Sequence, residues 1–365
     1  MTDMKKTIDT NTVTSISGGE FDDVDVGLTT VMSPSGKQIV IKANDVDMAM
    51  EFVKDHEHLE MDPEYEKKVL RKIDWWIIPL ISALMSCQLM DKTTNSYASI
   101  MGLRTDLNMT SYQYSWVGSI FYFGYLVFEY PANVALQKLP LSKTVSSAVM
   151  IWGVILMCHA ACHSAGPFLV CRFFLGVFEG VMNPAYILLT SQWWKKNEQF
   201  MRSCIWFGFQ GFGTLVGAGI AHGLYTYRVG EHAFASWRLL YIITGIITIF
   251  LGALSYIHIP DIPIKAWFLN DLDKKYVVER IRGNQIGFGS KHYKKYQVIE
   301  AFLDPITYLF FVYGISYSIA NASFTNFGSI LLNKDFGFST GDSLLMNMPG
   351  GGIDIVIPPV VAYLN

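Results

Sequence analysis

The sequence predicts an all-α integral membrane protein, and three observations carry this prediction: long apolar stretches, few charged residues, and a one-sided distribution of lysine and arginine. Of the 365 residues, 51% are hydrophobic and 16% are charged, whereas a soluble chain carries about a quarter charged residues. Charged residues crowd the first 72 positions, so the remainder is even poorer in charge. The net charge of −3 argues against a nucleic-acid-binding protein, which would need a basic face.

Eight apolar stretches are long enough to form membrane-spanning helices. A helix that crosses the hydrocarbon core needs roughly 20 mostly apolar residues, and it satisfies its own backbone hydrogen bonds. No alternating strand pattern competes with the helical interpretation of these stretches. We expect helices near residues 75–102, 113–136, 144–164, 167–191, 204–226, 237–259, 303–331 and 341–363.

Polar segments divide the chain into four parts. The N-terminal tail has no apolar core typical of a signal peptide, and we expect disorder to about residue 43. A short amphipathic stretch around Asp45–Lys72 follows, and a charged linker runs from Asp261 to about Glu300. The parts are a polar tail (1–72), a six-helix bundle (73–260), a linker (261–302) and the start of a second bundle (303–365).

Lysine and arginine predict the orientation of the chain, because cytoplasmic loops of membrane proteins carry an excess of both. A cytoplasmic N-terminus places nearly all of these residues inside, together with the charged linker, and the flipped topology places them outside. The inner side then carries Lys67, Lys68, Arg71, Lys72, Lys138, Lys143, Lys195, Lys196 and Arg202, and the outer side carries Arg104, Arg228, Arg238 and Lys334.

The chain also repeats a short sequence at equivalent points of two bundles. Residues 106–111 (DLNMTS) follow the first predicted helix, and residues 335–340 (DFGFST) follow the seventh. In each copy a Ser or Thr can cap the next helix. A six-helix unit, a linker and a second copy would need helices 9 to 12 as well. We therefore expect this chain to be a fragment or a truncated gene product, with an unusual eight-helix protein as the alternative.

Asp91 and Lys92 are ionisable residues within the first apolar stretch. Burying such groups in a membrane is costly, so they usually face a cavity and mark function. The small polar residues Thr93–Ser96 follow directly, which suggests a helix loosened over a water-filled cavity. Alternatively, the helix ends at Met90 and the charged pair marks its outer rim.

Arg172 and Glu179 lie seven residues apart in the fourth predicted helix, and therefore share one face. Arg172 is either a solute-binding cation or a structural clamp on backbone carbonyl groups. Burial favours the neutral form of Glu179, which suits reversible protonation. Gly176 and Gly180 would allow a neighbouring backbone to approach closely.

Other polar residues carry less weight. Glu129 lies near the inner end of its helix and favours an anchoring role, His159 and His163 favour packing, and the role of Asp354 stays open. The five cysteines show no metal-ligand spacing and are expected to pack as small apolar residues. Phosphate-binding loops, nucleophile elbows and metal-binding helices are absent from the sequence. We therefore expect no enzyme, no metal and no cofactor.

Three motifs resemble those of the anion:cation symporters of the major facilitator superfamily, and most closely those of the fungal allantoate permease group. They are MDKT at 90–93, the run from SIFYFGY to EYPAN at 119–133, and RFFLGVFEG at 172–180 followed by Asn183-Pro184. The resemblance is clearest from Arg71 to Trp194 and continues more weakly to the end. It implies the major facilitator fold of two six-helix halves.

The resemblance also implies roles for individual residues. Asp91 and Glu179 would carry protons, and Lys92 would bind a substrate carboxylate near Arg172. Many relatives have Arg beside the Asp, and the Lys found here offers a point charge instead of a bidentate fork. Further polar contacts to the substrate are expected from Gln210, Tyr317 and Asn321.

The implied activity is proton-coupled uptake of a small organic anion by alternating access about a site near the midplane. Allantoate and ureidosuccinate are the first substrates to consider, with nicotinate-like vitamins or small peptides next. The alternatives are a carrier of another solute, such as a thiamine-related compound or a drug, and a non-transporting nutrient sensor or truncated paralogue. We expect a monomer in the lipid bilayer, a multi-pass protein of a fungal plasma membrane that binds protons and its solute but no nucleic acid.

Overall fold

The computed structural model describes residues 28–32, 38–42, 62–227, 234–282 and 295–364, and it divides into two compact units, Met1–Val46 and Asp47–Asn365. In the first unit, strands β1 (Leu28–Met32) and β2 (Gln38–Lys42) pair antiparallel, with Leu28 opposite Lys42 and Met32 opposite Gln38. The expected disorder up to residue 43 is therefore wrong for these ten residues, whose β-branched side chains favour extended backbone. The rest of that tail lies outside the described residues.

The second unit begins with helix α2 (Pro63–Ala98), which continues into the π-helical turn η2 (Ser99–Leu103) and the short α3 (Arg104–Asp106). The Asp62 side chain accepts a hydrogen bond from the Glu64 amide at 3.0 Å, and Pro63 occupies the first helical position, both typical of helix starts. Of the expected amphipathic stretch 45–72, residues 63–72 form the first turns of α2, and residues 45–61 lie outside the described part.

All eight predicted apolar stretches are helical, but three of them consist of two helices. The breaks lie at Gly180–Val181, at Phe209 and at Met346–Asn347. The helices are α4 (Ser111–Lys138), α5 (Leu141–Cys158) with η3 (His159–Ala161), α6 (Ala165–Glu179) and α7 (Met182–Trp193), α8 (Lys196–Gly208) and α9 (Gln210–Tyr227), α10 (Ser236–His258), α13 (Pro305–Ile330) with η5 (Leu331–Asp335), and α14 (Thr340–Leu345) and α15 (Met348–Leu364).

Within the described residues, six helical segments are long and apolar enough to cross a membrane. Helices α4, with 28 residues, and α13, with 26, are not among the six, although at about 1.5 Å per residue they exceed the roughly 30 Å of a hydrocarbon core. The six segments are Pro63–Asp106, Leu141–Ala161, Ala165–Trp193, Lys196–Tyr227, Ser236–His258 and Thr340–Leu364.

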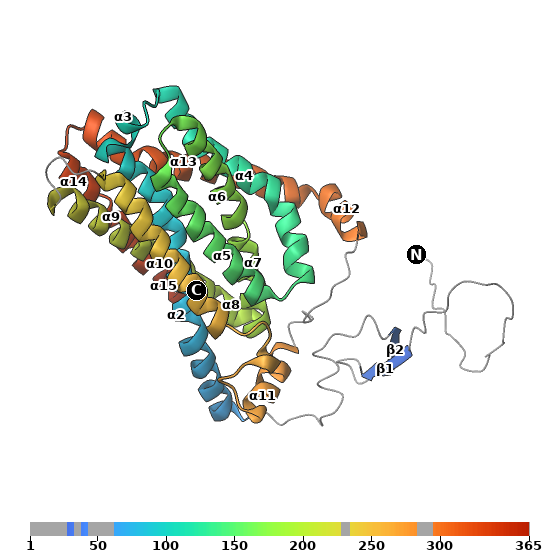
Figure 1. Ribbon diagram of the computed structural model, residues 1–365. Coiled ribbons are helices and arrows are strands. Elements are labelled where there is room, and N and C mark those ends of the chain that lie inside the picture. The colour runs from blue at the N-terminus through green and yellow to red at the C-terminus, as the bar shows by residue number, and fades with distance from the viewer. Residues whose placement is uncertain (1–27, 33–37, 43–61, 228–233, 283–294, 365) are drawn as a thin grey trace. The chain divides into compact units, whose positions relative to one another are not determined.

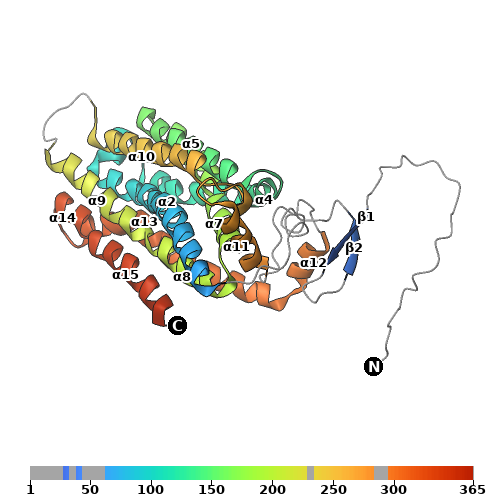
Figure 2. The ribbon, with the colours of Figure 1, turned by 90° about the horizontal axis from the view of Figure 1, so that it is seen from below.

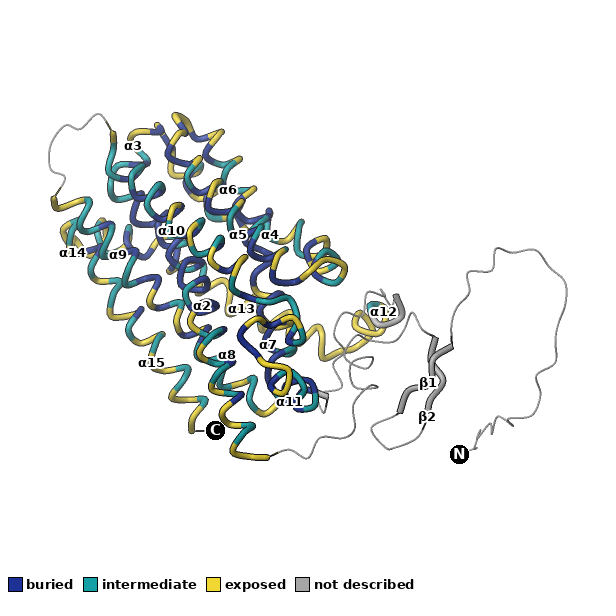
Figure 3. Tube along the Cα trace, turned by 60° about the horizontal axis from the view of Figure 1, so that its bottom comes forward, coloured by how far each residue is buried: buried dark blue, intermediate teal, exposed yellow. Residues whose placement is uncertain are grey.

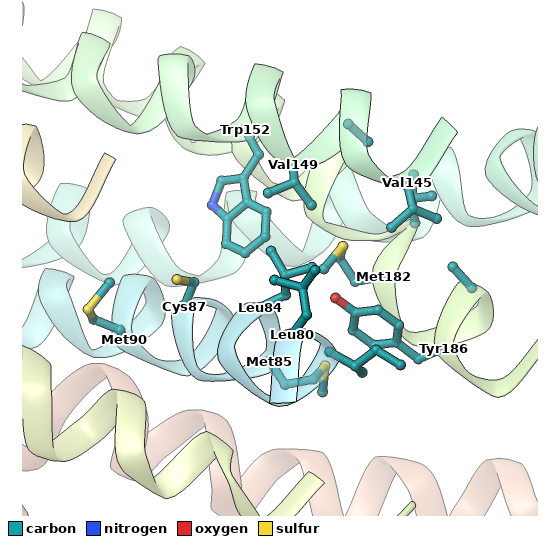
Figure 4. Close-up of a cluster of buried hydrophobic side chains, with 14 of the residues drawn as sticks. Leu80, Leu84, Met85, Cys87, Met90, Val145, Val149, Trp152, Met182 and Tyr186 are labelled. Atoms are coloured by element: carbon teal, nitrogen blue, oxygen red, sulfur yellow. The ribbon is translucent and has the colours of Figure 1, made fainter. Parts of the chain in front are cut away.

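Helix α2 forms the centre of the packing in the second unit (Figure 1), and it is buried over most of its length beyond Lys72 (Figure 3). Leu84 of this helix is fully buried. In Figure 4, Trp152 reaches from α5 toward α2 beside Cys87 and Leu84, and Tyr186 approaches from α7. Apolar side chains from helices on either side of α2 therefore form one core.

Glycines bring α4 and α6 into backbone contact. A Cβ atom at Gly176 would lie 2.0 Å from the carbonyl oxygen of Phe121, and one at Gly124 would lie 2.1 Å from that of Phe173. The close approach expected at Gly176 is confirmed. At Gly180 the nearest atom, 3.3 Å away, belongs to its own helix, so that residue does not admit a second backbone as closely.

The helices after the linker pack on the first bundle. Helix α13 lies against α2, where the Ser329 amide donates to Ser96 Oγ at 3.2 Å, and α15 lies along α8 and α9 (Figure 2). Gly211 of α9 and Gly351 of α15 meet at the second contact, since a Cβ on either would lie within 2.6 Å of the other's carbonyl oxygen. The helices after the linker therefore contact the first bundle at α2 and α9.

The linker contains η4 (Pro263–Lys265), α11 (Asp271–Arg282) and α12 (Lys295–Leu303), and α11 docks through buried charges. The side chain of Arg280 is fully buried; its Nε donates to Glu66 Oε1 at 2.8 Å, and its Nη2 donates to both carboxylate oxygens of Glu198 at 2.6 and 2.8 Å. Such charge-assisted contacts are the strong hydrogen bonds of proteins. They hold α11 against the starts of α2 and α8.

A second contact of α11 involves Asp273, which accepts hydrogen bonds from Tyr65 at 2.7 Å and Lys72 at 2.8 Å. Burial opposes the charged form of this carboxyl, but the hydrogen bonds from Lys72, Tyr65 and the Asn270 amide outweigh it and lower its pKa. Asp273 is therefore ionised at neutral pH, and its attraction to Lys72 is lost only as the pH falls below the ordinary carboxyl range.

Replacing Gly176 with Ala tests the α4–α6 contact. The new methyl group would push the two backbones apart, at a cost of about 1–3 kcal/mol, and we expect a lower thermal midpoint in detergent micelles. Gly166→Ala in the same helix is the matched control, since nothing lies within 4 Å of its Cβ position. Equal midpoints for the two variants would contradict the close crossing.

Candidate functional site

The four ionisable residues singled out in the sequence lie inside the first bundle, two on α2 and two on α6. Asp91 and Glu179 are 0% exposed, and Arg172 is 3% exposed. Helix α2 runs on to Ala98, so the alternative in which the first helix ends at Met90 is wrong. These charges belong to the interior.

The polar run after Lys92 is a regular α-helix and is not loosened as expected. The Thr94 hydroxyl donates to the Met90 carbonyl oxygen at 2.8 Å, and Thr93 bonds to the preceding turn in the same way. These hydroxyls are satisfied by their own helix. The irregularity lies further along, in the π-helical turn Ser99–Leu103, where Gly102 has a φ of 107°. Turns of this kind are frequent at functional sites.

Lys92 forms an ion pair with Glu179 across the α2–α6 contact. Its Nζ lies 3.0 Å from Glu179 Oε1 and 5.8 Å from the ring centre of Phe121. The side chain of Glu179 is 0% exposed and that of Lys92 is 22% exposed, so the lysine is the more accessible member of the pair. The partner of Lys92 is the acid on the other helix and not its neighbour Asp91.

Arg172 and Asp91 both contact helix α10. The Arg172 Nη2 donates to the Tyr241 hydroxyl at 2.6 Å, and the Tyr241 ring stacks on His159 with centroids 5.1 Å apart. The Thr248 hydroxyl donates to Asp91 Oδ2 at 3.5 Å, which is a long hydrogen bond. Helix α10 is therefore a third wall of the site.

Sequence analysis missed Tyr241 and Thr248. Both lie in a strongly apolar predicted helix, and neither is ionisable at neutral pH. The pattern that could have found them is a stripe of hydroxyl residues at helical spacing, all of them buried: Tyr241, Thr244, Thr248 and Ser255. Such a stripe on one face marks the side of a helix that meets polar groups.

Asp91, Lys92, Arg172 and Glu179 form a polar layer inside the bundle. Several buried polar atoms around this layer have no hydrogen-bond partner among the described residues. They include Arg172 Nε, His159 Nε2 and Asp91 Oδ1. Interiors satisfy the large majority of their buried polar groups, and exceptions call for an explanation such as a functional role. Orphaned atoms around these residues favour a site that exchanges partners or protons.

The other expected site residues lie elsewhere. Gln210 is partly exposed at the start of α9, and Tyr317 and Asn321 are exposed on α13. Among the described residues, no hydrogen bond joins any of these three to Lys92. His163 and Asp354 are exposed as well. The structure therefore groups Asp91, Lys92, Arg172 and Glu179. Within the described part of the chain, no hydrogen bond or ion pair joins these four to Gln210, Tyr317, Asn321, His163 or Asp354.

Residues 80–365 match the sequence model of the Major Facilitator Superfamily. The chain belongs to this superfamily. It is 44% identical over 340 residues to the allantoate permease of Saccharomyces cerevisiae, and the matched region covers 92% of this chain and 62% of the permease. It is 33% identical over 345 residues to a thiamine pathway transporter of the same yeast, with 94% and 64% covered. The chain thus spans somewhat less than two thirds of these curated relatives.

Solved structures of the superfamily share this fold. A bacterial homolog of the human lysosomal transporter Spinster, inward-facing and unoccupied, matches with a TM-score of 0.57 at 13% identity, covering 81% of this chain and 61% of that one. A proton:xylose symporter matches with a TM-score of 0.55 at 14% identity, covering 82% and 70%. The all-α major facilitator prediction is confirmed, and the relatives are transporters and permeases, not enzymes.

A double-mutant cycle tests the Lys92–Glu179 pair. Lys92→Met alone strands a buried carboxylate and should cost about 3 kcal/mol of stability, because breaking a buried pair leaves one charge uncompensated. Glu179→Leu should cost less, since the Lys92 side chain is partly exposed. The double variant should lose less than the sum of the two in detergent unfolding. Strictly additive losses would show that the two side chains do not interact, and Lys138→Met is the surface control.

Proposed function

We propose that this protein takes up a small organic anion together with protons by alternating access. The observation that carries the proposal is the Lys92–Glu179 pair, which places a partly exposed cation against a fully buried acid. A cation held in this way can exchange its protein carboxylate for the carboxylate of a solute. Membership of a transporter superfamily and the allantoate permease relative support the same reading.

The exchange would couple anion binding to protonation. When a substrate carboxylate pairs with Lys92, Glu179 loses its only ion-pair partner among the described residues. An unpaired carboxylate at 0% exposure is very unfavourable, and neutralisation by a proton is the ordinary escape. One proton would then enter with each carboxylate, so the loaded bundle carries no additional charge through the membrane.

Asp91 is the second proton-carrying residue in this scheme. It is as fully buried as Glu179, and one of its oxygens has no hydrogen-bond partner in the described part of the chain. Arg172 sits on the same layer and is held by Tyr241. We infer that Arg172 balances the charge of Asp91 when that carboxyl is ionised, and that it belongs to the binding layer.

Ureides with a carboxylate, such as allantoate and ureidosuccinate, are the proposed substrates, with nicotinate-like vitamins and small peptides next. Lys92 supplies a point charge for the carboxylate. Gln210 and Asn321 are amides that suit the urea groups, and Tyr317 is a further polar contact; these residues come from α9 and α13. Rocking of the two halves would bring them to the loaded Lys92.

A carrier of a different solute is the second candidate, and the thiamine pathway transporter relative favours it. Competition of labelled allantoate uptake by unlabelled ureides, nicotinate and thiamine-related compounds separates the two. Ligand binding without flux in liposomes would identify a sensor. We propose a plasma-membrane, monomeric protein. We propose a cytoplasmic N-terminus because the first part of α2, whose sequence includes Lys67 and Arg71, lies beside the linker helix α11 at one end of the bundle (Figure 1).

Glu179→Gln tests the coupling. The amide keeps the size of the side chain but cannot release a proton, so anion accumulation driven by a pH gradient should fall to that of protein-free liposomes. Exchange of labelled for unlabelled anion should persist. Glu129→Gln is the control, because Glu129 lies on α4 and forms no ion pair with a described residue. Full gradient-driven accumulation by Glu179→Gln would contradict the role of this residue in proton coupling.

A further inference from the structure

Two thiols meet at the end of the bundle opposite α11, where α5 passes through η3 into α6 (Figure 1). Cys162 directly follows η3, and Cys171 lies in the first half of α6. Their sulfur atoms are 4.0 Å apart. Cys162 is buried and Cys171 is partly exposed, so Cys171 is the more exposed residue of the pair.

The geometry needs only a small movement to join these sulfurs. A disulfide has an S–S distance of about 2.05 Å, so the two atoms must approach by about 2 Å. Cys171 is fixed in a helix, but Cys162 has extended backbone (φ −74°, ψ 138°) in the short junction before α6. That junction can supply the movement without unwinding either helix.

We propose that Cys162 and Cys171 are a redox-modified pair that peroxide converts to an intramolecular disulfide. The Cys171 thiolate attacks one peroxide oxygen, which releases water and leaves a sulfenic acid. The Cys162 thiolate then attacks that sulfur and displaces hydroxide, which takes up a proton to leave as water. Two thiols lose two electrons and two protons, and one hydrogen peroxide becomes two waters.

The bond would form beside the candidate site. Cys171 immediately precedes Arg172, and the junction that carries Cys162 begins with His159, which stacks on the Tyr241 ring that Arg172 contacts. Arg238 of α10 donates to the Ala160 carbonyl oxygen in the same turn. A disulfide would therefore tie the ends of α5 and α6 together at the edge of the Arg172 layer. This inference is independent of the proposed substrate and of proton coupling.

Peptide mapping of the full chain in native membranes tests the pair. Membranes are treated with hydrogen peroxide, remaining thiols are blocked with N-ethylmaleimide, and chymotrypsin then cleaves after Phe168, between the two cysteines. We expect a Cys162–Cys171 linked pair of peptides, lighter by about 2 Da than the two thiol peptides together because two hydrogens are lost. Dithiothreitol should separate it.

Matched variants make the result specific. Cys162→Ser should abolish the linked peptides and leave Cys171 available to the maleimide after a dithiothreitol step, whereas Cys204→Ser should form the link as the unchanged protein does. Folding of each variant is checked by its elution as a monodisperse peak. Full maleimide labelling of both Cys162 and Cys171 after peroxide would overturn the proposal. A link from Cys171 to Cys158 would overturn it equally.

Discussion

A carboxyl group that is fully enclosed by helices needs either a cation or a proton, and in this protein Glu179 of α6 is joined to Lys92 of α2. The pair bridges the central helix α2 and helix α6, which packs on α4. Its two members are unequally accessible, with the acid side chain enclosed and the Lys92 side chain partly exposed. In the proposed function, that asymmetry would let an incoming anion compete for Lys92, and a proton would then neutralise the displaced acid. Proton coupling in the proposed function depends on this one arrangement.

The packing around the pair explains why it can be held. Glycines at the α4–α6 crossing bring the two backbones together, so that Phe121 comes close to Gly176 and its ring lies near the Lys92 ammonium. Helix α10 closes the other side with hydroxyl groups that reach Arg172 and Asp91. Backbone proximity therefore positions the polar layer.

Length and hydropathy were sufficient to predict the eight helical stretches, because a membrane-spanning helix must be apolar over a fixed length. They did not predict the breaks at Gly180–Val181 and Phe209, since a short change of direction leaves the hydropathy of the segment unaltered. The hairpin β1–β2 was missed because a polar composition was given more weight than two short segments rich in β-branched residues. Both kinds of error concern local backbone geometry, to which average composition is insensitive.

The sequence singled out the residues of the candidate site, but it did not predict the contacts between them. Ionisable groups in apolar helices identified Asp91, Lys92, Arg172 and Glu179, yet the sequence did not indicate which acid pairs with Lys92. The true partner lies 87 positions away on another helix, and only the packing of α2 on α6 brings it within 3.0 Å. Tyr241 was missed for the same reason, because its importance comes from reaching Arg172 across a helix boundary.

Proton uptake on anion binding tests the central claim most directly. Purified protein in weakly buffered nanodiscs is mixed with allantoate, and the pH change is followed with an indicator dye. Since binding of the anion and protonation of Glu179 are linked, we predict uptake of about one proton per bound anion, and a clearly smaller uptake in Glu179→Gln at equal anion occupancy. Anion binding to the unchanged protein without any proton uptake would contradict the account.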